Sequence, residues 1–204
     1  MAEAFSIPTR PHRQFLPEDF KVSTWEELNP YFDKLLVQEI TSEKNLAEWL
    51  HNRSELESVI SEDAGWRYIQ MTCFTENEEY RKSYQDFVQN IQPNIAPIAD
   101  QLNKKVMASP FLTLLEKQPG YDMMIRNLRK EIEIFRENNV PLYTEINTQT
   151  QKYAQISGAM TVEVEGKELT LQQASIILMS TDRAKRENIF HKINDRRLQD
   201  RDAL

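Results

Sequence analysis

The chain has 204 residues, of which 40% are hydrophobic and 28% are charged, the composition of a soluble globular protein long enough to bury its own core. Only four glycines are present, which favours long helices over many-turned sheets. The net charge of −7 argues against a nucleic-acid or anionic-membrane surface, and the single cysteine, Cys73, excludes both an intrachain disulfide and a thiolate zinc site.

Residues 1–22 are predicted to form an extended arm. Pro8, Pro11 and Pro17 fix the backbone of this segment and remove hydrogen-bond donors from it. The arm lacks the apolar core of a signal peptide, and no run in the chain approaches the length of a bilayer span. We therefore expect a cytoplasmic protein with no membrane partner.

Two helix starts follow the arm. Ser23 or Thr24, followed by glutamates, forms the first capping box, and residues 41–43 form the second start. Apolar residues then recur with helical spacing, which predicts one buried face on each helix. These residues are Trp25, Leu28, Phe32, Leu35 and Leu36 in the first helix, and Leu46, Trp49, Leu50, Leu56, Val59 and Ile60 in the second.

The second helix is predicted to continue past Gly65 through residues 61–74. Trp66, Ile69 and Cys73 keep the apolar stripe in this segment. Because Cys73 is flanked by apolar residues and has no electropositive neighbour, we expect it to be a buried small hydrophobe rather than a reactive thiol.

Further helices are predicted downstream. Residues 75–78 form another capping box, and Pro93 and Pro97 are expected to end or bend the helix that follows it. The apolar face of that helix comprises Tyr80, Tyr84, Phe87, Val88 and Ile91. Helical patterns over 95–108, 121–137 and 142–156 are separated by short segments rich in Pro, Gly and Asn, which suits antiparallel packing.

A single strand pair is predicted near residues 160–170. Side chains alternate over residues 161–165, Gly166 and Lys167 supply a turn, and residues 168–169 return before Thr170 caps a new helix. Two strands alone are marginally stable, so the hairpin should lean on helices or pair with something outside the chain.

The last helical pattern runs from about Asp182 to Leu198. No Gly or Pro follows that would end this helix before the chain ends, so we expect a helix that is truncated in its middle. The predicted fold class is mainly α, a bundle-like lobe of antiparallel helices with one small β-hairpin.

No catalytic or metal-binding motif is found. None of His12, His51 and His191 belongs to an HExxH sequence, in which two histidines and a glutamate lie on one helix face, and His51 and His191 are interpreted as ordinary surface residues. Phosphate-binding glycine loops and GxSxG elbows are also absent. We therefore predict no catalytic and no metal residues in this chain, and assign no substrate-binding residue.

Two further residue patterns are interpreted as structural. The acidic pairs at 62–63 and 78–79 diverge by roughly 100° on a helix and are expected to face water rather than share a proton. Met123 and Met124, next to apolar neighbours, are expected to fill the core.

Five segments together resemble the N-terminal part of bacterial oligoendopeptidase F, a member of the thimet oligopeptidase-like zinc peptidases. The resemblance covers about residues 15–204, and the hairpin with the segment after it is its most distinctive part. The segments are SEDAGWRYIQMTC (61–73), LNKKVMASPFL (102–112), KEIEIFRENNVPLYTEI (130–146), SGAMTVEVEGKELTLQQA (157–174) and DRAKRENIF (182–190).

The resemblance implies a zinc metalloendopeptidase of two helical lobes around a channel that admits short peptides. In that family two HExxH histidines and a downstream glutamate hold zinc, and the HExxH glutamate activates water. No residue of this chain matches those positions, so zinc is implied for the parent protein and not for this chain. The implied organisation is an arm (1–22) and an N-terminal lobe (23–204) truncated before the catalytic domain of the same polypeptide.

Two readings of function follow. The first is a lobe, inactive alone, that helps to form the channel wall of the peptidase and excludes long substrates. The alternative is a complete helical protein-interaction module without enzymatic activity. A separated lobe can self-associate through its bared apolar patch, whereas a true module should be a stable monomer. A standalone enzyme that uses carboxylates or histidine alone is disfavoured, because no constellation of such residues is apparent.

Overall fold

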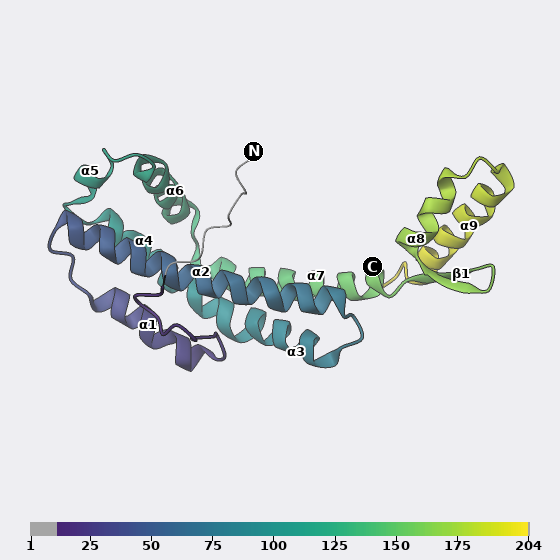
Figure 1. Ribbon diagram of the computed structural model, residues 1–204, viewed down its shortest axis with the longest axis horizontal. Coiled ribbons are helices and arrows are strands. Elements are labelled where there is room, and N and C mark those ends of the chain that lie inside the picture. Colours follow the sequence, from purple (N-terminus) through teal and green to yellow (C-terminus); the bar gives the residue numbers. More distant parts are fainter. Residues whose placement is uncertain (1–11, 204) are drawn as a thin grey trace, which may run out of the picture. The chain divides into compact units, whose positions relative to one another are not determined.

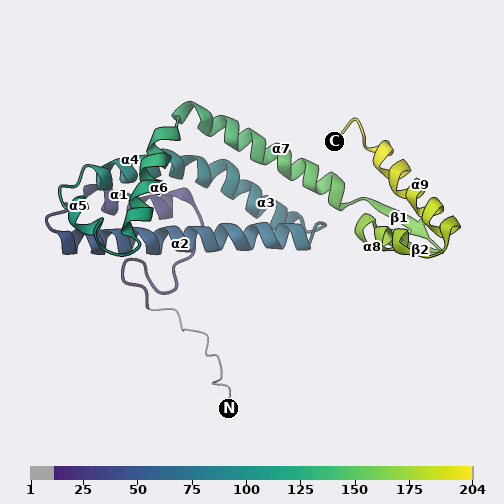
Figure 2. The ribbon, with the colours of Figure 1, turned by 90° about the horizontal axis from the view of Figure 1, so that it is seen from above.

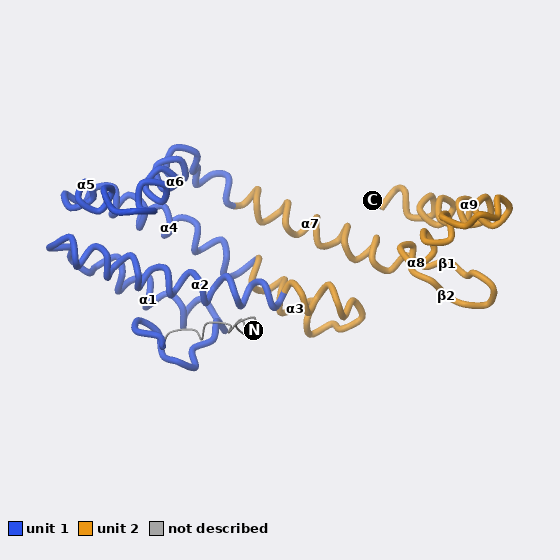
Figure 3. Tube along the Cα trace, turned by 45° about the horizontal axis from the view of Figure 1, so that its top comes forward, with its two compact units in different colours: residues 1–67, 89–140 blue, residues 68–88, 141–204 orange. Residues whose placement is uncertain are grey.

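The computed structural model describes residues 12–203 and has the predicted mainly-α fold with one small hairpin. Helices account for 73% of the described residues. The chain divides into two compact units, which are coloured separately in Figure 3: residues 1–67 with 89–140, and residues 68–88 with 141–204. Pro8 and Pro11 of the predicted arm lie outside the described residues.

In chain order, the elements are α1 (Trp25–Val37), α2 (Glu43–Cys73), α3 (Glu78–Asp86), the π-helix η1 (Phe87–Ile91), α4 (Gln92–Met107), α5 (Leu112–Leu115), α6 (Tyr121–Ile134), the 3-10 helix η2 (Glu137–Asn139), α7 (Val140–Gly158), β1 (Thr161–Val164), β2 (Lys167–Thr170), α8 (Leu171–Ile176), the 3-10 helix η3 (Ile177–Met179) and α9 (Arg183–Gln199). Figure 1 labels α1 to α9 and β1, and Figure 2 also labels β2.

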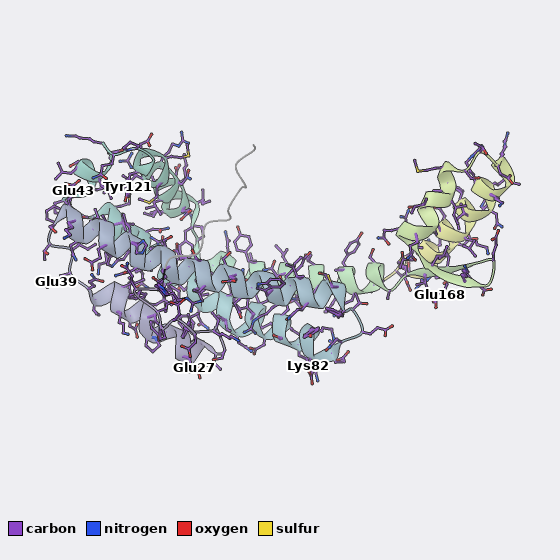
Figure 4. All side chains as sticks on the ribbon, viewed as in Figure 1. Glu27, Glu39, Glu43, Lys82, Tyr121 and Glu168 are labelled. Atoms are coloured by element: carbon purple, nitrogen blue, oxygen red, sulfur yellow. The ribbon has the colours of Figure 1, made fainter. Side chains whose placement is uncertain are left out.

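The predicted starts of the first two helices are confirmed. The Thr24 side chain accepts a hydrogen bond from the backbone N–H of Glu27, which is labelled near the start of α1 in Figure 4. The Ser42 hydroxyl likewise accepts from the N–H of Asn45 at 3.1 Å. Most residues of the predicted apolar faces are buried, with Trp49 completely inaccessible to solvent, while Trp25 and Leu36 are half-buried.

A lysine from α4 stabilises the end of α1. Lys105 Nζ donates hydrogen bonds to the carbonyls of Leu35, Leu36 and Gln38 at 2.9, 2.5 and 2.6 Å. These carbonyls have no partner within the helix, so the ammonium group satisfies the acceptors that α1 leaves open. Burial lowers the pKa of Lys105 below its ordinary value, and the charge of Glu39 opposes that shift. The contact fixes α4 against α1.

The second helix continues past Gly65 as predicted, but its predicted apolar stripe is wrong. Trp66 and Ile69 are 58% and 46% exposed, and Cys73 is exposed as well. The buried side passes instead through Arg67, whose guanidinium donates to Asp63 at 2.6 Å and to the carbonyl of Val22 at 2.6 Å. Because of the ion pair and the backbone contact, a charged residue, Arg67, faces inward at this point. A pattern of apolar residues does not reveal it.

The predicted break at the two prolines is wrong in part. The Asn77 side chain, rather than Thr75, caps α3 by accepting from two backbone N–H groups. The chain then stays helical through η1 into α4, where Pro93 lies in the first turn and Pro97 inside the helix. A proline ring clashes with the carbonyl four residues earlier, and a π-turn is a known way of widening a helix. The wider turn of η1 therefore lies just before Pro93, and the helix continues past this proline.

The hairpin packs on its own helices, as expected. In β1 and β2 the residue partners run from Thr161 with Thr170 to Val164 with Lys167. The turn is Glu165-Gly166, with φ of 52° and 75°, one residue earlier than predicted. Figures 1 and 2 show α8 and α9 beside the hairpin. The buried cluster there consists of Met160, Val162, Leu171, Ala174, Ile189 and Ile193.

Both helices of this region begin at a side-chain cap, and the cap predicted at Thr170 is confirmed. Thr170 and Gln173 form a complete capping box at the start of α8. The Asp182 carboxylate accepts from the N–H groups of Ala184 and Lys185 at the start of α9. That helix ends at Gln199, and residues 200–203 form turns.

Candidate functional site

The structure brings two of the three histidines to one shallow pocket. A surface pocket of about 210 Å³ in the first unit is lined by His12, His51, Glu55 and Glu62, among others. His191 lies elsewhere, exposed on α9, with its ring edge-on to Phe190. Within residues 12–203, no group of three or more His, Cys, Asp or Glu side chains is arranged to hold a metal ion.

Glu55 is already occupied by the arm. Its carboxylate accepts the backbone N–H groups of Gln14, Phe15 and Leu16 at 2.8, 3.0 and 2.7 Å. Burial raises the pKa of Glu55, but these hydrogen bonds and the charge of His51 outweigh that effect and lower the pKa below its ordinary value. A carboxylate held in this way is an anchor for the backbone and a weak general base. Nothing in the sequence marks this residue.

The other candidate residues are dispersed. Asp63 pairs with Arg67 while Glu62 lines the pocket, so this acidic pair diverges as expected. Glu78 pairs with Arg81 on α3. Met123 is 58% exposed, so the expectation that it fills the core is wrong.

A larger groove lies on the second unit beside the hairpin. It has a volume of about 530 Å³. Its lining residues come from the hairpin, from α8 with η3, and from α9: Val164, Glu165, Ile176, Ile177, Met179, Ser180, Lys185, Asn188, Ile189 and Lys192. It therefore combines apolar side chains with lysines on one surface. Sequence reasoning identified the hairpin and both helices but not the groove between them.

An exposed apolar face runs along α7. Leu142, Tyr143, Ile146 and Tyr153 are 61%, 63%, 57% and 55% exposed. The last three recur at spacings of three and seven residues, which places them on one side of the helix. Large apolar side chains gathered in this way are typical of surfaces that contact another protein surface. Among residues 12–203, no helix is both long enough and apolar enough to span a bilayer.

Comparisons with known proteins identify relatives of this fold. The chain matches solved structures of a PZ peptidase A with an inhibitor, at 21% identity and a TM-score of 0.82, and of a protein designated oligoendopeptidase F, at 20% identity and the same TM-score. Each match covers 91% of this chain and 33% of the other, so the chain spans about one third of the length of these structures. No curated protein matches the chain.

The chain also matches a protein-family model in sequence. The model of the peptidase M3 N-terminal domain matches residues 15–135, which is more than half of the chain and includes most of the first unit. The predicted resemblance to the N-terminal region of oligoendopeptidase F is thereby confirmed. The chain belongs to the peptidase M3 N-terminal domain family.

Proposed function

We propose that the chain is the non-catalytic N-terminal lobe of a zinc metallo-oligoendopeptidase that hydrolyses short peptides. The observation that carries the proposal is the family match over residues 15–135. The fold match supports it, because it extends over 91% of the chain and over only one third of each solved peptidase. The remaining two thirds of such a protein would then supply the bond-breaking chemistry.

The lobe is proposed to position the peptide substrate and to exclude folded proteins, and not to take part in bond cleavage. The described residues do not fit a zinc site, since they contain no suitable group of metal-ligating side chains. No catalytic step is therefore assigned to them. A helical wall can hold a peptide in one register and keep folded proteins away from the reacting bond, and both effects favour cleavage of short substrates.

The proposed partners are the catalytic domain of the same polypeptide and short peptide substrates. The exposed apolar face of α7 supports a partner surface, because four large side chains there are more than half exposed. A cytoplasmic location is part of the proposal. It is supported by the single cysteine, since extracellular proteins of modest size commonly rely on disulfides.

A second candidate function is a helical interaction module without enzymatic activity. The same exposed face on α7 favours it, because an amphipathic helix or peptide could bind there. Under this reading the 204-residue chain should be a stable monomer that binds its partner without any catalytic domain.

The deciding experiment begins with the coding sequence beyond Leu204. If it encodes HExxH, the full polypeptide and the 204-residue chain are purified and compared for zinc content and for hydrolysis of a quenched-fluorescent, bradykinin-sized peptide. We expect the full polypeptide to contain zinc and to cleave the peptide, and the chain alone to do neither. A stop codon after Leu204, or stoichiometric zinc or cleavage in the chain alone, would overturn the proposal.

A further inference from the structure

The groove beside the hairpin has one basic wall. Lys185, Asn188 and Lys192 line it and follow one another on α9 at spacings of three and four residues. Residues at these spacings lie on the same side of a helix, so the three polar side chains form a row about 10 Å long. Ile189, which is buried beneath this row, also lines the groove.

The opposite wall is apolar and open to solvent. Ile176 and Met179 are 67% and 85% exposed although both are large hydrophobic side chains. Val164 and Ile177 are only partly buried against the cluster under the hairpin. An exposed apolar strip beside a row of polar donors has the two features that a peptide-binding surface requires. The apolar contacts anchor the peptide, and the polar groups orient it.

The charges around the groove favour an anionic occupant. Among residues 183–199, six are basic and two are acidic, a net of +4 in a chain whose net charge is −7. Arg186 and Arg196 are engaged elsewhere, the first with the carbonyls of Ser180 and Thr181 and the second with Asp200. These two arginines are therefore held in structural contacts.

The two lysines of the groove keep donors available. Lys192 Nζ donates one hydrogen bond, to the carbonyl of Glu163 at 2.6 Å, and an ammonium group has three donors. The backbone N–H of Lys185 donates to Asp182, but its ammonium group makes no hydrogen bond or ion pair within residues 12–203. Glu165 supplies the one carboxylate among the lining residues.

We propose that this groove binds an acidic peptide segment that carries apolar side chains. Its carboxylates would pair with Lys185 and Lys192, and its apolar side chains would cover Ile176 and Met179. The inference rests on the proposed function, because it takes a peptide as the occupant, and adds a binding place and a charge preference to it. A nucleic acid fits less well, since it offers no apolar groups to cover the exposed strip.

The test measures fluorescence anisotropy of two labelled peptides with the 204-residue chain. One peptide alternates Glu and Leu, and the other alternates Lys and Leu. We expect only the acidic peptide to bind, and its affinity to fall when salt rises from about 50 mM to about 500 mM, because exposed charge pairs are screened. Lys185→Glu should weaken binding by about fivefold or more, since an attraction becomes a repulsion. Met179→Ala should weaken it by about threefold through lost apolar area.

The matched control is Lys82→Glu. Lys82, labelled in Figure 4, is exposed on α3 and does not line the groove, and its substitution changes the net charge by the same amount as Lys185→Glu. We expect it to leave acidic-peptide binding unchanged. Equal binding of the basic peptide, equal losses in the two lysine variants, or binding only after dissociation of a dimer would overturn the inference. Because no hydrolysis is measured, such a failure leaves the peptidase proposal to its own test.

Discussion

At the scale of single residues, Glu55 shows how one side chain fixes a segment that has no regular structure. Three consecutive backbone N–H groups of the arm converge on its carboxylate. Leu16, which donates the shortest of the three bonds, is 4% exposed, so the contact also buries an apolar side chain. An arm without helix or strand thus gains partners for donors that would otherwise need water.

Acid is expected to release this contact. The pKa of Glu55 is lower in the folded chain than its ordinary value of 4.5, so the stabilisation is complete above that value and is lost as the pH falls through the folded pKa. Hydrogen exchange of the amides at residues 14–16, relative to unstructured peptides, should show protection at about pH 7 that disappears at about pH 3.

The substitution Glu55→Gln should reproduce the loss of protection at neutral pH. It should lower the free energy of unfolding by about 1 kcal/mol, because the carboxylate is partly exposed and solvent weakens its hydrogen bonds. Glu62→Gln is the matched control, since Glu62 lines the same pocket and is exposed. Equal protection in both variants would show that Glu55 does not hold the arm.

Residue-level prediction from sequence succeeded for most apolar positions of the first two helix starts and for capping positions. It failed at Trp66, Ile69 and Met123, which are exposed, and where a charge faces inward. Thr24 and Thr170 cap helices because their side-chain oxygens reach nearby backbone donors, which is a local property of the chain. Arg67 and Glu55 depend on partners about 40 residues away, at Val22 and at the arm. Such contacts are created by the tertiary fold, and no local pattern encodes them.

At the scale of elements, sequence patterns located the long helices and the hairpin but not the transitions between them. The expected helix 142–156 is α7, and the expected strand return at residues 168–169 lies within β2. The short helix α5 and the π-helix η1 were not predicted. A segment of four or five residues has too few turns to show a helical period, and a π-turn departs from that period.

Two glycines are expected to respond oppositely to alanine. Gly65 lies inside α2 with no atom within 4 Å of an added Cβ, so Gly65→Ala should raise the free energy of unfolding by about 1 kcal/mol. Gly166 has a φ of 75° in the hairpin turn, so Gly166→Ala should lower it by about 1 kcal/mol. Thermal unfolding followed by circular dichroism measures both changes. Shifts in the same direction would contradict the assigned backbone conformations.

At the scale of the whole molecule, each compact unit is assembled from separate stretches of sequence. The second unit combines residues 68–88 with 141–204, and α2 contributes residues to both units. A division of this kind follows from contacts between distant segments, so sequence composition does not reveal it. The predicted arm and lobe, 1–22 and 23–204, stay a prediction. Family membership, by contrast, could be predicted from short motifs and is confirmed.

The exposed face of α7 is expected to make the chain self-associate. Sedimentation velocity at rising concentration should show dimers or larger species, and the double variant Leu142→Glu, Ile146→Glu should remain monomeric because charges replace apolar contacts. The control, Val37→Glu with Met123→Glu, adds two charges at exposed apolar positions of the first unit and should still associate. A chain that stays monomeric at all concentrations would favour the interaction-module reading.

The junction at Thr170 limits how this part of the protein can vary in length. Thr170 is both the last residue of β2, opposite Thr161, and the cap of α8, so no loop residue separates the strand from the helix. Deletion of one residue from β2 would turn the side chains beyond it to the opposite face of the hairpin and rotate α8 by about 100°. Leu171 and Ala174 would then leave the buried cluster. Insertions and deletions should therefore be rejected between Lys167 and Ala174.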